Sequence, residues 1–139
     1  MDIIVGITLA LLLCGAAAGL GMDRERVFYL AVLIAIASYY VAFAVIDGRN
    51  EVMLSELAIA AVFIAGAVAG FRRNQWITVI ALAGHGVTDV FHHDLVHNTG
   101  VPHSWPGFCL SFDVTAAALV ALVMLARARG ERAQSFSPN

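Results

Sequence analysis

The sequence predicts an all-α fold: an integral membrane helical bundle of about five transmembrane helices, with the N-terminus outside and the C-terminus in the cytoplasm. Hydrophobic residues make up 60% of the 139-residue chain and charged residues only 13%. A water-soluble fold of this size cannot hide that much apolar surface. Long apolar runs, each close to the length of about 20 residues that spans a bilayer, alternate with short polar segments.

Five runs have the length and composition of a transmembrane helix, at residues 3–20, 27–46, 52–71, 76–95 and 107–126. The polar connections between them are too short for a soluble domain, so we expect one transmembrane domain. The fourth run is the least apolar, because its second half is rich in His and Asp. A polar tail at 127–139 follows the last run and is expected to be disordered.

The arginines give the predicted orientation. All eight cationic residues are Arg, and in a five-span arrangement only Arg49 lies outside. Positively charged flanks are retained in the cytoplasm. We therefore expect a multipass protein of the cell membrane, which would be the inner membrane in a bacterium. The seven arginines predicted to be cytoplasmic are Arg24, Arg26, Arg72, Arg73, Arg127, Arg129 and Arg132.

The composition argues against several other classes of protein. Arginines that cluster between apolar stretches give no support for a nucleic-acid partner. Cys14 and Cys109 lie in separate apolar runs without CxxC spacing, which indicates neither a thiolate zinc site nor a disulfide framework. Asp2 is the only charge before the first run, so that run lacks the positive flank of a signal peptide and is expected to be retained.

Two GxxxG spacings allow helix backbones to approach closely, Gly15/Gly19 in the first run and Gly66/Gly70 in the third. We expect them to serve packing within the bundle rather than a dedicated dimerisation face. Membrane lipids are the expected surroundings, and a homo-oligomer remains open.

Residues 84–114 carry all five histidines and three of the aspartates of the chain. Ionisable side chains cost several kcal/mol in hydrocarbon, so within a span they turn inward and usually mark a functional site. On an α-helix, one face of the fourth run presents a ladder of metal ligands: His85, Asp89, His92, His93 and, at its edge, His97.

The spacings within this ladder are those of metal-binding helices. Asp89 precedes His92 by three residues and His93 by four, as in the Glu-x-x-His pairs of helical bundles. His93 and His97 form an HxxxH pair. Asp113 of the fifth run and Glu56 of the third are predicted to lie at a similar depth, in the outer half of the bundle.

These residues predict a metal centre that opens toward the extracytoplasmic side. One ion held by Asp89, His92 or His93, and Asp113 would leave a position for water, with Glu56 as general base. His85 and His97 are further candidate ligands. Nitrogen and oxygen donors without thiolate fit Zn²⁺, Fe²⁺, Mn²⁺ or Cu²⁺, of which zinc or iron is expected.

Ordinary structural roles remain open for the same side chains. Asp113 or Glu56 alone would also serve as a hydrogen-bonded contact between helices. His85, near the middle of the membrane, would serve as well by donating to a backbone carbonyl, by supporting a ligand, or by relaying protons. His103, Trp76 and Trp105 are explained by the membrane interface.

The predicted function is a metal-dependent enzyme that acts on a lipid or another apolar small molecule, as a hydrolase with one ion or as an oxidoreductase with two. A proton or metal-ion transporter or channel that uses the ladder from His85 to His97 is the alternative. Haem ligation is a third hypothesis, although all five histidines belong to the fourth run and the loop that follows it.

Residues 84–114 also resemble the signature stretch of a family of small multipass bacterial membrane proteins, which implies a fold and no function. The HxxxH pair, together with Ser55 and Glu56, is similar in kind to features of the ceramidase-like membrane hydrolases. Those proteins have seven helices and a different order of motifs, so no residue roles are carried over from them.

Overall fold

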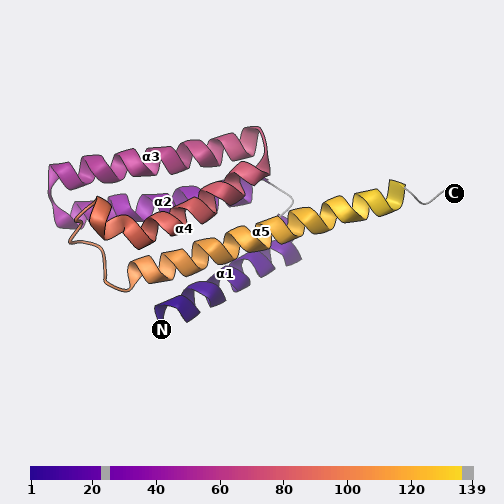
Figure 1. Ribbon diagram of the computed structural model, residues 1–139, viewed down its shortest axis with the longest axis horizontal. Coiled ribbons are helices and arrows are strands. Elements are labelled where there is room, and N and C mark those ends of the chain that lie inside the picture. Colours follow the sequence, from indigo (N-terminus) through magenta and orange to yellow (C-terminus); the bar gives the residue numbers. More distant parts are fainter. Residues whose placement is uncertain (23–25, 136–139) are drawn as a thin grey trace.

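The computed structural model describes residues 1–22 and 26–135, and this part of the chain is a bundle of five α-helices without strands (Figure 1). The predicted all-α bundle is therefore confirmed. The helices are α1 (Asp2–Gly19), α2 (Arg26–Asp47), α3 (Asn50–Arg72), α4 (Gln75–Leu95) and α5 (Trp105–Ser135).

Four of these helices are long and apolar enough to cross a membrane: α1, α2, α3 and α5. The fourth helix, α4, is not in this set although it has 21 residues. Its polar residues His85, Asp89 and His92 are buried inside the bundle. The low apolar content of α4 is thus compatible with a place in the bundle, because its polar side faces the other helices.

Consecutive helices run in opposite directions, so α1, α3 and α5 point the same way (Figure 1). One end of the bundle holds the N-terminus, the turn between α2 and α3, and the loop 96–104. We call it the loop end. The other end holds the turn between α3 and α4, with Arg72 and Arg73, and we call it the arginine end. There Arg26 Nη1 lies 3.5 Å from the carbonyl oxygen of Phe71.

Short turns with defined local chemistry connect α2, α3 and α4. Gly48 has φ +79°, a left-handed conformation that other residues rarely adopt, and it reverses the chain between α2 and α3. Asn74 caps α4, because its side-chain oxygen accepts a hydrogen bond from the backbone nitrogen of Trp76 at 3.0 Å.

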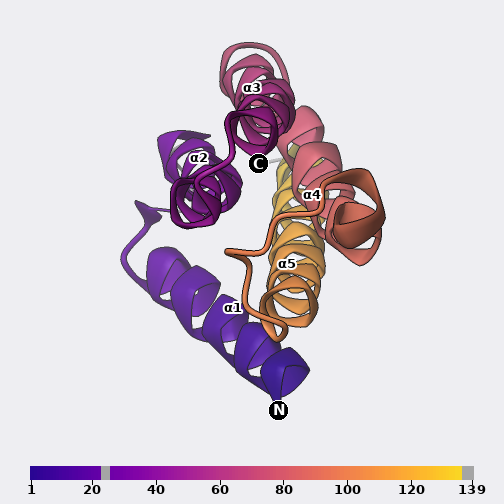
Figure 2. The same ribbon diagram turned by 90° about the vertical axis from the view of Figure 1, so that its left-hand side faces the viewer.

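α5 packs between α1 and α4, while α3 packs on both α2 and α4. Seen along the bundle, α1 lies at one edge of the assembly against α5 (Figure 2). Small residues let the backbones approach. A Cβ atom at Gly70 would collide with Thr78 across the α3–α4 contact, and one at Gly86 would press on Leu110 and Asp113 across the α4–α5 contact.

The structure separates the two GxxxG spacings. Gly66 and Gly70 lie in the α3–α4 contact, as expected for packing within the bundle, whereas Gly15 and Gly19 have open space where a side chain would be. Both cysteines, Cys14 and Cys109, are buried and free.

The polar tail differs from the prediction. It was expected to be disordered from residue 127, but α5 continues as a helix to Ser135 and extends past the rest of the bundle (Figure 1). Residues 127–134 contain three Arg and two Ala together with Glu131 and Gln134, all of which have high helix propensity, so the helix continues beyond the apolar run. The rest of the predicted tail, 136–139, lies outside the described residues, as does Arg24.

Candidate metal centre

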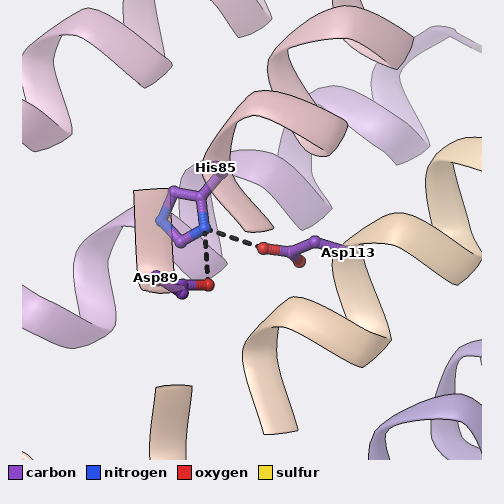
Figure 3. Close-up of side chains that lie close together, drawn as sticks. All are labelled: His85, Asp89 and Asp113. Carbon is purple, nitrogen blue, oxygen red and sulfur yellow. Dashed lines mark hydrogen bonds and ion pairs between the residues drawn. The ribbon is translucent and has the colours of Figure 1, made fainter. Parts of the chain in front are cut away.

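A histidine and two aspartates meet inside the bundle between α4 and α5. Nδ1 of His85 lies 2.7 Å from Oδ2 of Asp113 and 3.6 Å from Oδ2 of Asp89. Figure 3 shows the two carboxylates converging on the same ring nitrogen. The three side chains are at most 3% exposed. We call these three residues the His85 cluster.

Helix geometry and one glycine bring the cluster together. His85 and Asp89 are four residues apart on α4, so they share one face of the helix. Asp113 comes from α5, which reaches α4 closely at Gly86: a Cβ atom there would be 3.0 Å from Cβ of Asp113. A larger residue at position 86 would push Asp113 away from His85.

The His85 cluster has more buried acceptor atoms than donors. A carboxylate only accepts hydrogen bonds when ionised, so with Asp113 ionised the proton between the two groups belongs to Nδ1 of His85, and it has to leave if this nitrogen binds a metal ion. Oδ2 of Asp89 and Oδ1 of Asp113 are buried and make no hydrogen bond to any other described group. Buried oxygens of this kind are costly to leave without a partner, and a cation is one partner that would satisfy both of them.

The donor set fits a transition metal. One ligand atom from each of His85, Asp89 and Asp113 lies within 4.8 Å of the others, which is close enough to surround a single ion. An imidazole nitrogen with carboxylate oxygens suits zinc or iron. A divalent cation would also neutralise the two carboxylates, whereas the single proton on His85 leaves their charge uncompensated.

A second histidine of α4 pairs with the predicted general base. Nε2 of His92 lies 3.0 and 3.2 Å from the two carboxylate oxygens of Glu56 on α3. The side chain of Asn98 donates to Oε1 of Glu56 at 2.8 Å. Glu56 is 1% exposed and His92 is 3% exposed. We call His92, Glu56 and Asn98 the His92 cluster.

Tyr40 of α2 lies between the two clusters. Its ring stacks on His92 with a centroid distance of 4.0 Å and lies 6.1 Å from the ring of His85. The buried Tyr40 hydroxyl interacts with the carboxylate of Asp89 but lies outside ordinary hydrogen-bond geometry. The two clusters and Tyr40 therefore form one buried polar row that ends at Asn98, in the loop end.

The polar row stops at His85 on its way to the arginine end. Phe63 packs edge-on against the His85 ring with centroids 4.7 Å apart. Leu82, almost one turn further along α4, is fully buried. Apolar side chains thus border the row on this side, whereas His92 and Asn98 line a cavity at the loop end.

His93 and His97 lie apart from the buried row. Both side chains are exposed, and their Nδ1 atoms are 3.3 Å from each other. α4 ends at Leu95, so His97 belongs to the loop rather than to the helix face on which we placed it. The structure does not bring these two histidines to the His85 cluster.

Of the predicted metal ligands, the structure thus unites His85, Asp89 and Asp113. The sequence favoured His92 or His93 as the histidine beside Asp89, but the structure supplies His85. The i, i+4 spacing of His85 and Asp89, with Gly86 between them, is the sequence signal that would have favoured His85.

The sequence analysis did not predict Asn98. This residue belongs to a loop, and a loop residue has no helical spacing that would place it next to Glu56.

Arg49 anchors the loop 96–104 to the end of α2. Arg49 Nε donates to Asp47 at 2.7 Å, and Arg49 also binds the carbonyl oxygen of His97. Asp47 in turn accepts hydrogen bonds from the backbone and the hydroxyl of Thr99. The bond to Asp47 raises the pKa of the Arg49 guanidinium above its ordinary value. Arg49 therefore has a structural role at the loop end.

An apolar cavity of about 300 Å³ lies between α1, α2 and α5. Tyr39 lines it, while its neighbour Tyr40 faces the polar row, so the cavity and the row lie on two sides of α2. On α5 the cavity is lined by Trp105, Cys109 and Phe112, close in sequence to Asp113. The indole nitrogen of Trp105 is buried without a hydrogen-bond partner among the described residues.

No protein-family model matches the chain. Searches of curated proteins and of solved structures likewise gave no match. The function must therefore be argued from the helical bundle and from its polar residues.

Proposed function

We propose that this protein is a metal-dependent membrane enzyme that binds a transition metal through His85, Asp89 and Asp113 and acts on a lipid or another apolar substrate. The observation that carries the proposal is a pair of buried carboxylate oxygens, Asp89 Oδ2 and Asp113 Oδ1, that make no hydrogen bond of ordinary geometry to a described residue. Their carboxylates lie close to the imidazole of His85. An enzymatic metal site keeps a coordination position open, and three protein ligands leave one.

A zinc or iron ion in this position would supply Lewis acidity toward a carbonyl and would lower the pKa of a bound water. Side chains of the protein would accept and transfer the proton that such a water releases. Tyr40 stands between the two clusters, and His92 is held by Glu56 in a fixed orientation. His92 also lines a cavity at the loop end, through which it can exchange a proton with water. Glu56 would then act through His92, as a positioning residue.

The apolar cavity supports an amphiphilic substrate. Its lining is almost wholly hydrocarbon and aromatic, as an acyl chain requires. A substrate in this cavity would lie beside Cys109 of α5, one turn of helix before Asp113.

We also propose that the loop end faces the extracytoplasmic side. The described arginines other than Arg49 belong to the arginine end or to the extension of α5, which the positive-inside rule places in the cytoplasm. Single cysteines at Ser104 and Asn74, probed on intact cells with an impermeant maleimide, test this orientation. Only Ser104→Cys should be labelled, and labelling of Asn74→Cys alone would reverse it.

Metal analysis of the detergent-purified protein tests the proposed function first. The wild type should carry close to one equivalent of a transition metal that Asp113→Asn lacks. Asp94→Asn, a change to an exposed acid on the same helix, should retain the metal. A wild type that binds no more zinc or iron than Asp113→Asn, even after incubation with these ions, would refute the proposal.

Catalysis is tested with the metal-loaded protein in mixed micelles containing amphiphilic esters and amides, with the products identified by mass spectrometry. Turnover should require Asp113 and should stop when a chelator removes the metal.

Transport is the second candidate, since the polar row is continuous from Asp113 to Asn98. Proteoliposome flux of protons or metal ions that is lost in Asp113→Asn would favour it. Phe63 and Leu82, which border the row, favour the enzyme.

A further inference from the structure

A cavity of about 380 Å³ at the loop end collects most of the histidines of the chain. It lies between the last turn of α4 and the loop 96–104. Four of the five histidines line it: His92, His93, His97 and His103. No acid and no other ionisable side chain lines this cavity. Its donors are therefore imidazole nitrogens, together with Asn98 and Thr99.

Two of these imidazoles are already placed at the separation that a metal ion demands. Nδ1 of His93 and Nδ1 of His97 are 3.3 Å apart. Two nitrogens that each lie about 2.0–2.1 Å from a tetrahedral zinc ion are themselves about 3.3–3.4 Å apart. A neutral pair of imidazoles also allows one N–H···N hydrogen bond at this distance, but such a bond does not explain why further histidines face the same cavity.

The backbone of both residues is held in place. His93 belongs to the last turn of α4, and the backbone nitrogen of Val96 bonds to the carbonyl oxygen of His92. The carbonyl oxygen of His97 is bound by Arg49, which is fixed by Asp47. The next residue, Asn98, is anchored on Glu56. A site with a fixed backbone loses little entropy when it binds an ion.

We propose that His93 and His97 form a second, exposed transition-metal site, which captures an imidazole-preferring ion such as Zn²⁺ at the loop end. His103 lies in the same cavity and is the candidate third ligand. The site has only neutral donors, whereas the His85 cluster has two carboxylates. The exposed site therefore binds zinc more weakly and exchanges it faster than the buried centre.

The position of His92 connects the two sites. One edge of His92 lines the loop-end cavity, and its ring stacks on Tyr40, which borders the His85 cluster. An ion captured by His93 and His97 thus lies at the water-facing end of the polar row. This link rests on the proposed function, but the exposed site itself does not.

The test is a zinc titration of the purified, chelator-stripped protein in detergent by isothermal calorimetry. The wild type should bind two equivalents. The double variant His93→Ala/His97→Ala should lose the weakly bound zinc and keep the tightly bound one at the His85 cluster. Asp113→Asn should lose the tightly bound zinc and keep the weakly bound one. Both histidines are exposed, so these changes should leave the fold intact, and Asp94→Ala provides a matched exposed control.

A chemical readout tests the same site without calorimetry. Diethylpyrocarbonate should modify His93 and His97 in the metal-free protein, and zinc should protect both in wild type and in Asp113→Asn. If the buried centre does not exist, one zinc should still bind and should still depend on His93 and His97. Zinc binding that the double variant leaves unchanged, or modification of these histidines that zinc does not slow, would overturn the proposal.

Discussion

His85 and His92 lie on the same face of α4, and each meets a carboxylate from another helix, yet the two sites are completed differently. Glu56 accepts from both His92 and Asn98, and neither Glu56 nor His92 has a buried polar atom without a partner. The His85 cluster has two carboxylates for one imidazole, and an oxygen of each is left without a hydrogen bond.

This difference shows how a His–carboxylate pair that only joins two helices can be distinguished from a metal site made of the same residue types. A buried His–carboxylate pair with every atom satisfied stabilises the contact between helices. A buried cluster with unmatched acceptors is unfavourable by itself and is stabilised when a cation binds. We therefore place the proposed metal in the His85 cluster, and we expect the His92 cluster to stabilise the contact between α3 and α4 as well.

The largest expected effect comes from removing the carboxylate of the satisfied cluster. Glu56→Ala should lower the free energy of unfolding in detergent by about 3–5 kcal/mol, because it leaves His92 and Asn98 buried without their partner. Chemical denaturation followed by circular dichroism measures this change. Glu56→Gln, which can still accept from Asn98, should lose less. A Glu56→Ala protein as stable as wild type would remove the distinction between the two clusters.

The next largest effect is on metal affinity. Asp113→Asn should weaken metal binding at the buried centre at least about 100-fold, or about 2.7 kcal/mol, because it removes a charged ligand. The stability of the metal-free protein should stay the same or rise, since one buried charge is gone. Competition with a chromophoric chelator gives the affinity, with Asp94→Asn as the control. A large loss of metal-free stability would instead make Asp113 a structural residue like Glu56.

A substitution in the contact between α3 and α4 should have a smaller effect on stability. Gly70→Val should destabilise the protein by about 1–3 kcal/mol, because its side chain would collide with Thr78 and push apart the helices that carry Glu56 and His92. Gly15→Val, in the other GxxxG spacing, meets open space and should change stability by no more than about 0.5 kcal/mol. Equal effects of the two substitutions, measured by thermal unfolding, would contradict the packing described for α3 and α4.

The sequence predicts the helices well because hydrophobic runs, polar turns and positive flanks all mark the same boundaries. The prediction that the chain is disordered from residue 127 was wrong for a physical reason. Polar residues end an apolar run but do not end a helix, and the segment 127–135 contains no helix breaker other than Gly130.

The site was predicted only in part. Helical spacing places His85, Asp89, His92 and His93 within one broad arc, but it does not say which of them meets Asp113. That choice depends on the close approach at Gly86 and on the end of α4 at Leu95, which turns His97 into a loop residue. These are tertiary features, and a single helix does not encode them.

The smallest expected effect is at Tyr40, which borders both clusters. Tyr40→Phe keeps the ring that stacks on His92 and deletes a buried hydroxyl that makes no hydrogen bond of ordinary geometry, although Asp89 lies near it. Because an unsatisfied buried hydroxyl is unfavourable, the metal-free protein should gain up to about 1 kcal/mol of stability. Its metal affinity should change less than about threefold, since the hydroxyl is not among the ligands. Chemical denaturation and chelator competition measure the two quantities. A loss of more than about 1 kcal/mol would mean that the hydroxyl donates a hydrogen bond to Asp89. The contrast between the two clusters would then rest on Asp113 alone.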